Sequence, residues 1–228
     1  MKFDLFKTVA IAAIALAAGS ANAAVSGSLL FDQTPSSPLT GIASDDGAAF
    51  SQYEAADNFS VATTSQLTGL VFWGNRLSGQ TLDNFTVRIY ADDPSFPGAP
   101  SISPLFTANL GEITGVNTVV FDDAGVQVLR YEADALSGPI LTAGEQYWIS
   151  IVNTLGVQND DFFWSFGPFG ADGFNAGRSL LGAPVDFDVF ADGDYAFQVY
   201  GTQVPEPGSI ALLGAGLALA GFARRKRA

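Results

Sequence analysis

The sequence predicts an all-β protein whose central part is a two-sheet β-sandwich, and two observations support this fold class. Apolar and polar side chains alternate over short runs, as they do in a strand that turns one face to a core. Clusters rich in Gly, Pro, Asp and Asn separate these runs and favour turns. Helical periodicity is confined to the two ends of the chain, and no internal repeat occurs at a fixed period.

Residues 1–23 predict a signal peptide with a short apolar helix. Two lysines precede an apolar run at residues 9–18, and Ala21-Asn22-Ala23 has the small-x-small form of a cleavage site. We expect signal peptidase to recognise Ala21 and Ala23, so that the exported chain begins at Ala24. An uncleaved amphipathic anchor is the alternative.

Residues 24–203 predict the sandwich. About 180 residues are enough for one well-buried core and too few for two. We expect a jelly roll of about eight to ten strands, with a closed barrel as the alternative. The strands are expected within residues 28–31, 53–59, 67–73, 85–89, 116–121, 126–131, 147–151, 161–166 and 195–199. Turns are expected at residues 75–80, 92–98, 122–125, 143–145, 167–177 and 192–194.

Residues 204–228 predict a C-terminal tail that can be processed. Pro205 and Pro207 flank Glu206, remove two amide donors and favour an extended strip that a protease can grip. The uncharged stretch 210–223 follows. As a helix it would span roughly 21 Å, against about 30 Å for the hydrocarbon core of a bilayer, so it predicts a marginal transmembrane helix.

The chain closes with four basic residues, Arg224, Arg225, Lys226 and Arg227. By the positive-inside rule they place this end in the cytoplasm and the rest of the chain on the other side of the membrane. A buried Gly/Ala-rich helix with a solvated basic end is the alternative interpretation.

The order of these parts closely resembles the PEP-CTERM sorting signal of Gram-negative bacteria, over about 25 residues. The resemblance implies that the membrane protease exosortase recognises Pro205, Glu206 and Pro207 and processes the chain near them. It implies an inner-membrane tether with the central domain in the periplasm, followed by display at the cell surface or release. It also implies an association with exopolysaccharide, biofilm and floc formation, and it says nothing about what the central domain binds.

The charge of the central domain excludes one class of partner. Of the ten basic residues, only Arg76, Arg88, Arg130 and Arg178 lie in it, together with 21 of the 23 acidic ones, since Asp4 and Glu206 fall outside. Its net charge is therefore near −17. Nothing basic is available to neutralise phosphates, so nucleic-acid binding is excluded.

Missing residue types limit the chemistry further. The chain has no His and no Cys, and its lysines all lie in the two terminal segments. This excludes Ser-His-Asp and Cys-His pairs, Schiff-base lysines and His/Cys metal sites in the central domain. Paired carboxylates that cleave glycosidic bonds remain available, from Glu54, Glu112, Glu132, Glu145 or the many Asp, but no spacing singles out a pair. We therefore expect a protein that is not an enzyme, and keep a glycan-cleaving enzyme as the third hypothesis.

Aromatic side chains are the candidates for ligand binding. Exposed rings stack on the apolar faces of sugars, so Trp73, Trp148 and Trp164 are possible binding residues of a carbohydrate-binding module. Packing in the core is the favoured interpretation for each of them. Trp148 is out of phase with its apolar neighbours Tyr147 and Ile149, so it faces outward or into a second layer.

Calcium is the one candidate ion. Acidic pairs occur near expected loops, at residues 92–93, 122–123, 160–161, 186/188 and 192/194, although no EF-hand loop is present. Asp also favours turns through local hydrogen bonds, which is the better explanation for any single pair. We expect no tightly bound cofactor or metal, and keep weak calcium binding as a hypothesis.

A second resemblance concerns the central domain. Several of its sequence segments look like segments that recur in uncharacterised exported bacterial sandwich domains, namely residues 56–59, 69–74, 87–94, 143–149 and 163–164. This resemblance supports the fold and implies no activity. The expected function is a structural or adhesive protein of the cell surface or extracellular matrix, with a carbohydrate-binding module as the second hypothesis.

Overall fold

The computed structural model describes residues 25–35, 41–47, 52–76, 83–154, 162–167, 173–181 and 185–205. The expected signal peptide, transmembrane helix and basic end lie outside these residues, and of the sorting tail only Val204 and Pro205 are described. The described residues form fifteen strands and no helix, so within them no helix is long and apolar enough to cross a membrane. The all-β prediction is confirmed.

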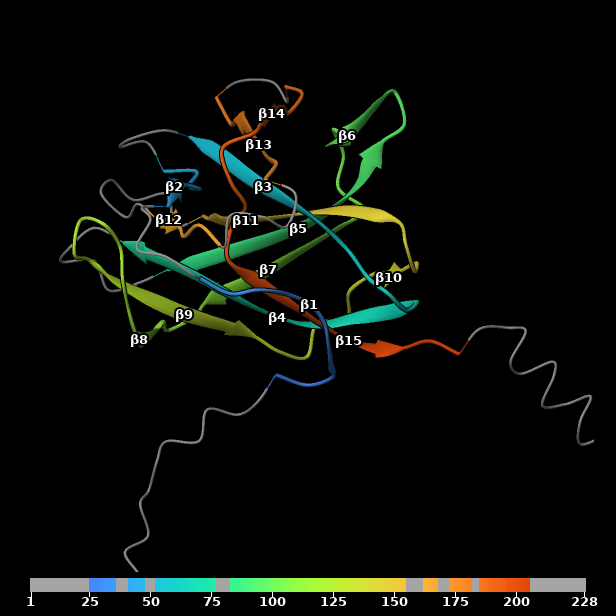
Figure 1. Ribbon diagram of the computed structural model, residues 1–228, viewed down its shortest axis with the longest axis horizontal. Helices are drawn as coiled ribbons and strands as arrows, with labels where there is room; N and C mark the ends of the chain where they lie inside the picture. Colours follow the sequence, from blue (N-terminus) through green and yellow to red (C-terminus); the bar gives the residue numbers. More distant parts are fainter. Residues whose placement is uncertain are drawn as a thin grey trace, which may run out of the picture.

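The first sheet has β4 (Ser65–Arg76) at its centre (Figure 1). One edge of β4 pairs with β15 (Phe197–Gln203) and β12 (Phe162–Trp164), and the other edge pairs with β9 (Gln127–Ala133) and β10 (Ile140–Leu141). Three outer strands complete the sheet, namely β1 (Ser28–Gln33) on β15, β2 (Ile42–Ala43) on β12 and β8 (Val116–Phe121) on β9.

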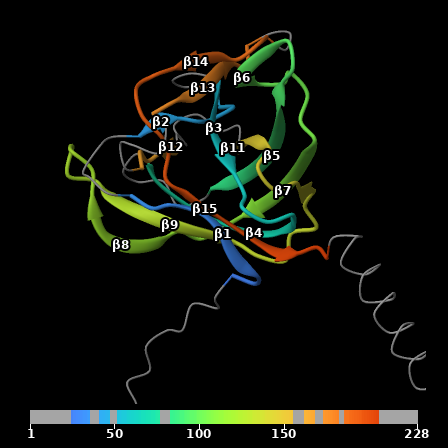
Figure 2. The same ribbon diagram turned by 45° about the vertical axis from the view of Figure 1, so that its right-hand side comes forward.

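The second sheet has the order β14-β13-β3-β11-β5-β6, with β7 also paired to β5. Its strands are β3 (Tyr53–Ser60), β5 (Asn84–Asp93), β6 (Phe96–Pro100), β7 (Phe106–Glu112), β11 (Gln146–Asn153), β13 (Asn175–Ser179) and β14 (Asp188–Phe190). The two sheets pack face to face (Figures 1 and 2), and isolated bridges from Asp45, just after β2, to Tyr53 and Asn153 link them at one edge. The sandwich prediction is therefore confirmed, whereas the closed barrel and the count of eight to ten strands are wrong.

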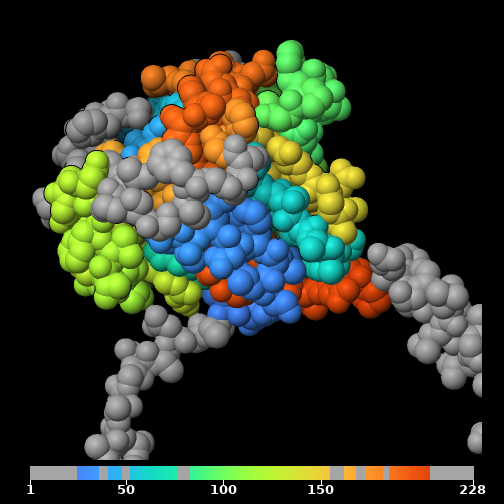
Figure 3. Space-filling model, viewed as in Figure 1, coloured from blue at the N-terminus to red at the C-terminus, as the bar shows by residue number. Residues whose placement is uncertain are grey.

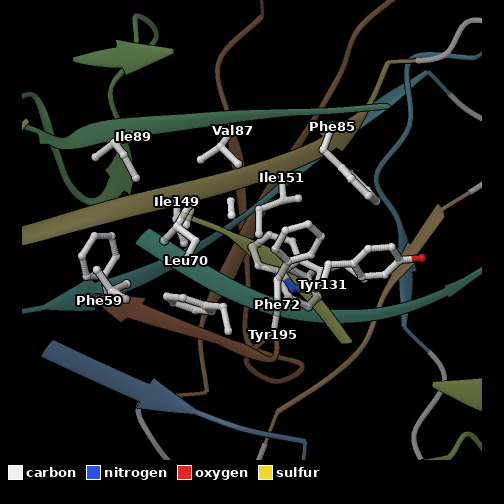
Figure 4. Close-up of a cluster of buried hydrophobic side chains, with 14 of the residues drawn as sticks. Phe59, Leu70, Phe72, Phe85, Val87, Ile89, Tyr131, Ile149, Ile151 and Tyr195 are labelled. Atoms are coloured by element: carbon white, nitrogen blue, oxygen red, sulfur yellow. The ribbon is translucent and has the colours of Figure 1, made fainter. Parts of the chain in front are cut away.

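The space between the sheets is filled by aromatic rings from both of them (Figure 4). Phe72 on β4 packs edge-on against Phe85 on β5, with ring centroids 4.9 Å apart, and stacks on Tyr131 of β9 at 5.1 Å. All three side chains are fully buried. Because the chain has no Cys, this close-packed core holds the two sheets together without a disulfide.

A second apolar layer covers the outer face of the second sheet. Tyr147 and Ile149 on β11 point into the core between the sheets, and Trp148 between them points the other way. Trp148 is fully buried there, in a cluster with Ala56, Tyr90, Ala176 and Phe187. The layer forms because β6 and β14, at opposite ends of the strand order, meet over this face (Figure 2).

Two strands of the second sheet, β6 and β13, overlap segments where turns are expected from the sequence. The run of Asp, Pro and Gly at residues 92–98 forms a hairpin instead, since β5 continues to Asp93 and β6 pairs back onto Asp92 and Asp93. Prolines are tolerated in β6 because an outer strand does not need every amide for pairing. Likewise, β13 begins within the expected turn 167–177.

The described domain begins and ends at the same pole. Strand β1 runs antiparallel to β15 and places Ser28 opposite Gly201, so the start of one strand lies beside the end of the other. Thr68 holds the entering chain, because its hydroxyl donates a 2.8 Å hydrogen bond to the Ser26 carbonyl. The amide of Val204 donates to the Thr64 carbonyl at 3.0 Å and fixes the point where the tail leaves. Strands β6 and β14 lie at the opposite pole in both views (Figures 1 and 2).

Candidate functional site

The three tryptophans are core residues. Trp148 and Trp164 are fully buried, and Trp73 is 6% exposed. The indole N–H of Trp164 donates to the Ala196 carbonyl at 3.0 Å, and that of Trp148 donates to the Asp92 carboxylate at 3.1 Å. Stacking on a sugar requires an exposed ring face. The core between the sheets covers Trp164, the second layer covers Trp148, and Trp73 is buried in a separate cluster with Val25, Val71, Val128 and Ala196. The hypothesis that these rings form a sugar-binding surface is therefore wrong.

The carboxylate of Glu54 lies beneath the second layer and has three side-chain partners. Its Oε1 accepts hydrogen bonds from the Tyr90 hydroxyl at 2.7 Å and from Arg88 at 3.1 Å, and its Oε2 accepts one from Arg178 at 2.9 Å. Burial alone would raise the pKa of the Glu54 carboxyl, but Arg88, Tyr90 and Arg178 together hold this pKa below its ordinary value. A fully buried carboxylate with these partners joins strands and is closed to substrate.

Asp57 shows the opposite shift. Burial raises the pKa of its carboxyl well above the ordinary value. The hydrogen bond from the Tyr195 amide opposes this shift, and nearby Asp194 adds to it. Oδ2 of Asp57 accepts from the Tyr195 amide at 2.6 Å and from Gln33 Nε2 at 2.8 Å. A shifted carboxyl beside a second carboxyl is typical of glycan-cleaving sites, but both Asp57 and Asp194 are buried.

All four arginines of the central domain are in ion pairs. Arg88 and Arg178 both contact Glu54, Arg76 contacts Asp83 at 2.9 Å, and Arg130 contacts Glu132. Since these are the only cations of this domain, its remaining charge is carried by carboxylates. Its surface therefore repels polyanions.

The described acidic pairs expected as calcium ligands lie at strand ends or in the segments between strands. Oδ1 of Asp93 accepts from the Ser95 amide at 2.7 Å, and Oδ1 of Asp122 accepts from the Val126 amide at 2.7 Å. Oδ1 of Asp92 accepts from the Gly98 amide and from Trp148. The described part of the chain holds no group of three or more Asp, Glu, His or Cys arranged to bind a metal ion. The pair at residues 160–161 lies outside the described residues.

A groove of about 640 Å³ lies where the two outer hairpins meet. One wall is the β5–β6 hairpin, in green in Figure 3, and the other is the segment that leads into β14, in orange. The groove is lined by Asp93, Ser95, Phe96, Pro97, Gly98, Ala99, Pro100, Asp186, Phe187 and Val189. It is the candidate binding site of the domain, because its size is that of small-ligand sites and its walls are mostly apolar.

The groove combines a rigid base with an exposed aromatic rim. Phe187 is 8% exposed, is packed edge-on against Tyr90 at 5.3 Å, and carries the Arg178 guanidinium 4.3 Å from its ring centre. Phe96, at the tip of the hairpin, is 70% exposed. The sequence does contain a signal for this site, since Phe96 is an apolar ring inside a run of Asp, Pro and Gly. That run predicts only a turn, so the signal is visible only in retrospect.

The sorting residues Pro205, Glu206 and Pro207 follow directly on β15. Pro205 is exposed, and Glu206, Pro207 and the basic residues Arg224–Arg227 lie outside the described residues, as do Ala21 and Ala23. The described part of the tail thus leaves the sheet at the pole where the chain also enters, at Val25.

Comparison with known proteins yields one match. A protein-family model described as the PEP-CTERM protein-sorting motif matches residues 203–227. Neither the curated proteins nor the solved structures contain a significant match, so the jelly-roll assignment stays a prediction. The chain therefore carries the PEP-CTERM protein-sorting motif, which marks an exported protein with a C-terminal membrane anchor that an exosortase processes.

Proposed function

We propose that this protein is a non-catalytic structural or adhesive component of the cell surface or extracellular matrix, associated with exopolysaccharide or biofilm. The sorting motif at residues 203–227 is the observation that carries the proposal, since it delivers the domain to the outside and tethers it there. In this proposal signal peptidase removes residues 1–23, the stretch 210–223 spans the inner membrane, and the domain passes from the periplasm to the surface.

The position of the two chain ends supports this role. Because β1 begins beside the end of β15, cleavage by signal peptidase and anchoring by the tail both act at one pole. The opposite pole, with the groove between β6 and β14, then points away from the membrane (Figure 1). Such an orientation suits a protein that contacts material outside the cell.

A carbohydrate-binding module is the second candidate function, and the groove is the observation that favours it. Its walls offer the rings of Phe96, Phe187 and two prolines, which suit the apolar face of a sugar. The binding residues would then be those of the groove instead of the tryptophans. The third hypothesis, a glycan-cleaving enzyme, has weaker support because Glu54 and Asp57, two of the carboxyls with shifted pKa in the described residues, are fully buried.

The sorting step is tested by replacing Pro205, Glu206 and Pro207 with alanine in a host that contains an exosortase. We expect the variant to stay in the inner-membrane fraction at full tail length, whereas the wild type is shortened and reaches the surface. Thr202→Ala, an exposed substitution just before the motif, is the matched control and should be processed normally. Normal shortening of the triple variant would contradict the role of the motif.

The matrix role needs a separate measurement. We expect cells that lack the gene to retain less exopolysaccharide, and the wild-type chain, but not the triple variant, to restore it. A deletion strain with unchanged matrix mass and cohesion would contradict the structural or adhesive role, even if sorting is normal.

A further inference from the structure

The groove between the β5–β6 hairpin and β14 has a definite electrostatic character. Its ionisable lining groups are the carboxylates of Asp93 and Asp186. The nearest cation, Arg178, lies behind the groove, where it pairs with Glu54, donates to the Ile102 carbonyl at 3.1 Å and covers the ring of Phe187. A ligand in the groove therefore meets two negative charges and no free positive one, which favours a cation and disfavours uronates, sulfates and phosphates.

The walls of the groove distinguish a sugar from a peptide. A peptide that docks by strand addition needs backbone donors and acceptors along a free strand edge. Pro97 and Pro100 remove two of the five amide donors of β6, so this edge is poorly suited to pairing. The same prolines and the exposed ring of Phe96 offer flat apolar faces, against which the C–H face of a pyranose ring can stack.

We infer that this groove binds cationic amino sugars, that is, 2-amino-2-deoxyhexose units whose ammonium group is attracted by Asp93 and Asp186 while the sugar ring stacks on Phe96. The inference rests on the carbohydrate-binding function proposed above and names its substrate class. The Ser95 amide donates a hydrogen bond to the Asp93 carboxylate and fixes its position at the bend of the hairpin, where it can attract the ammonium group. The net charge near −17 adds a long-range attraction for a polycationic glycan, which salt weakens.

The test is a calorimetric titration of the purified full-length chain in a non-ionic detergent. The probes are a fully deacetylated glucosamine oligomer, its N-acetylated counterpart, a galacturonate oligomer and a short lysine peptide. We expect binding of the glucosamine oligomer, at least tenfold weaker binding of the N-acetylated and galacturonate oligomers and of the peptide, and lower affinity as salt is raised. Equal affinity for the N-acetylated oligomer, or tighter binding of the lysine peptide, would overturn the inference.

Two variants separate the groove from the general charge of the surface. D93N/D186N should weaken binding of the glucosamine oligomer at least tenfold, whereas D32N/E112Q, which removes the same charge from exposed positions outside the groove, should change it less than twofold. Equal losses in both variants would show that charge alone attracts the oligomer, and would overturn the site.

Because Phe96 is 70% exposed, F96A leaves the fold intact and should also weaken binding severalfold, which covers the case in which D93N/D186N does not fold. Processing of the tail is unaffected by these variants, so failure of the glycan site is distinguishable from failure of sorting.

Discussion

Arg178 and Glu54 lie 124 residues apart in the chain and form a buried ion pair, in which Arg178 Nε donates to Glu54 Oε2 at 2.9 Å. The pair joins β13 to β3. Arg178 also donates to the Tyr90 hydroxyl at 3.0 Å, and that hydroxyl donates to Glu54, so β5 is bound into the same network. The second layer with Trp148 and Phe187 therefore rests on charged and polar groups that are hydrogen-bonded to one another.

Removing one partner of this pair should be costly. In Arg178→Met the carboxylate of Glu54 loses one of its two guanidinium partners in a buried place, and we expect a loss of about 3–5 kcal/mol in the free energy of unfolding. The matched control is Arg130→Met, which breaks the half-exposed pair with Glu132 and should cost about 1 kcal/mol or less. Urea unfolding followed by circular dichroism measures both. Equal costs for the two variants would show that the network contributes no more than a surface pair.

The raised pKa of Asp57 predicts that its contribution to stability decreases as pH rises, opposite to the usual behaviour of a carboxyl group. Its folded-state pKa is raised, so between about pH 3.9 and that raised value the unfolded chain ionises here while the folded chain keeps the proton. The contribution of Asp57 to stability therefore falls as pH rises through this window. Glu54 has the opposite sign, since its lowered pKa contributes stability that is lost as pH falls below about 4.3.

The test of this sign is the variant Asp57→Asn, which cannot ionise. We expect the stability of the wild type to decline more steeply than that of the variant as pH rises from 5 to 8. Both proteins keep Glu54, so its contribution cancels in the comparison. Parallel stability curves for the two proteins over this range would mean that Asp57 ionises in the folded state with an ordinary pKa, and would contradict this prediction.

The sequence predicts much of the core, because alternation within a strand is a local property. All nine expected runs overlap a strand, and the opposite orientations of Tyr147 and Trp148 are confirmed. The partner of a side chain is not a local property. Nothing near Glu54 in the sequence indicates that Arg178 is its partner. The groove forms where β6 meets β14, and these strands have only five and three residues, which is too short for alternation of apolar and polar side chains to reveal them. The fold class is thus readable from the chain, whereas the candidate site is not.

Gly27 lies where the chain enters the sandwich, and we expect substitution at this position to destabilise the domain. Its φ is +108°, and an added Cβ would lie 2.8 Å from the Gly201 carbonyl oxygen on β15. Gly27→Ala should therefore destabilise the domain by more than the roughly 1 kcal/mol that a positive φ alone costs. Gly125→Ala is the control, because Gly125 also has a positive φ, +77°, with no atom within 4 Å of the added carbon. Similar melting temperatures for the two variants would show that the entering chain gives way easily.

The burial of all three tryptophans predicts their fluorescence. Indole rings shielded from water emit at short wavelength and are poorly reached by ionic quenchers, so iodide should quench the native protein far less than the unfolded one. No Trp lines the groove, so a glycan bound there should not quench the emission by direct contact. Efficient iodide quenching of the folded chain would show that at least one of these rings reaches solvent.

Weak calcium binding stays a hypothesis, and the structure limits the form that it can take. With a net charge near −17 and all four arginines paired, the central domain attracts divalent cations. The described residues place no three acidic ligands together, so we expect low affinity and little preference between calcium and magnesium.

Binding to the folded state should raise the melting temperature and add about 1.4 kcal/mol of stability at a free calcium concentration of about ten times Kd. A melting temperature that does not change on titration with calcium would dispose of the hypothesis. A rise with calcium that magnesium does not reproduce at equal concentration would instead point to a selective site in the residues that the structure does not describe.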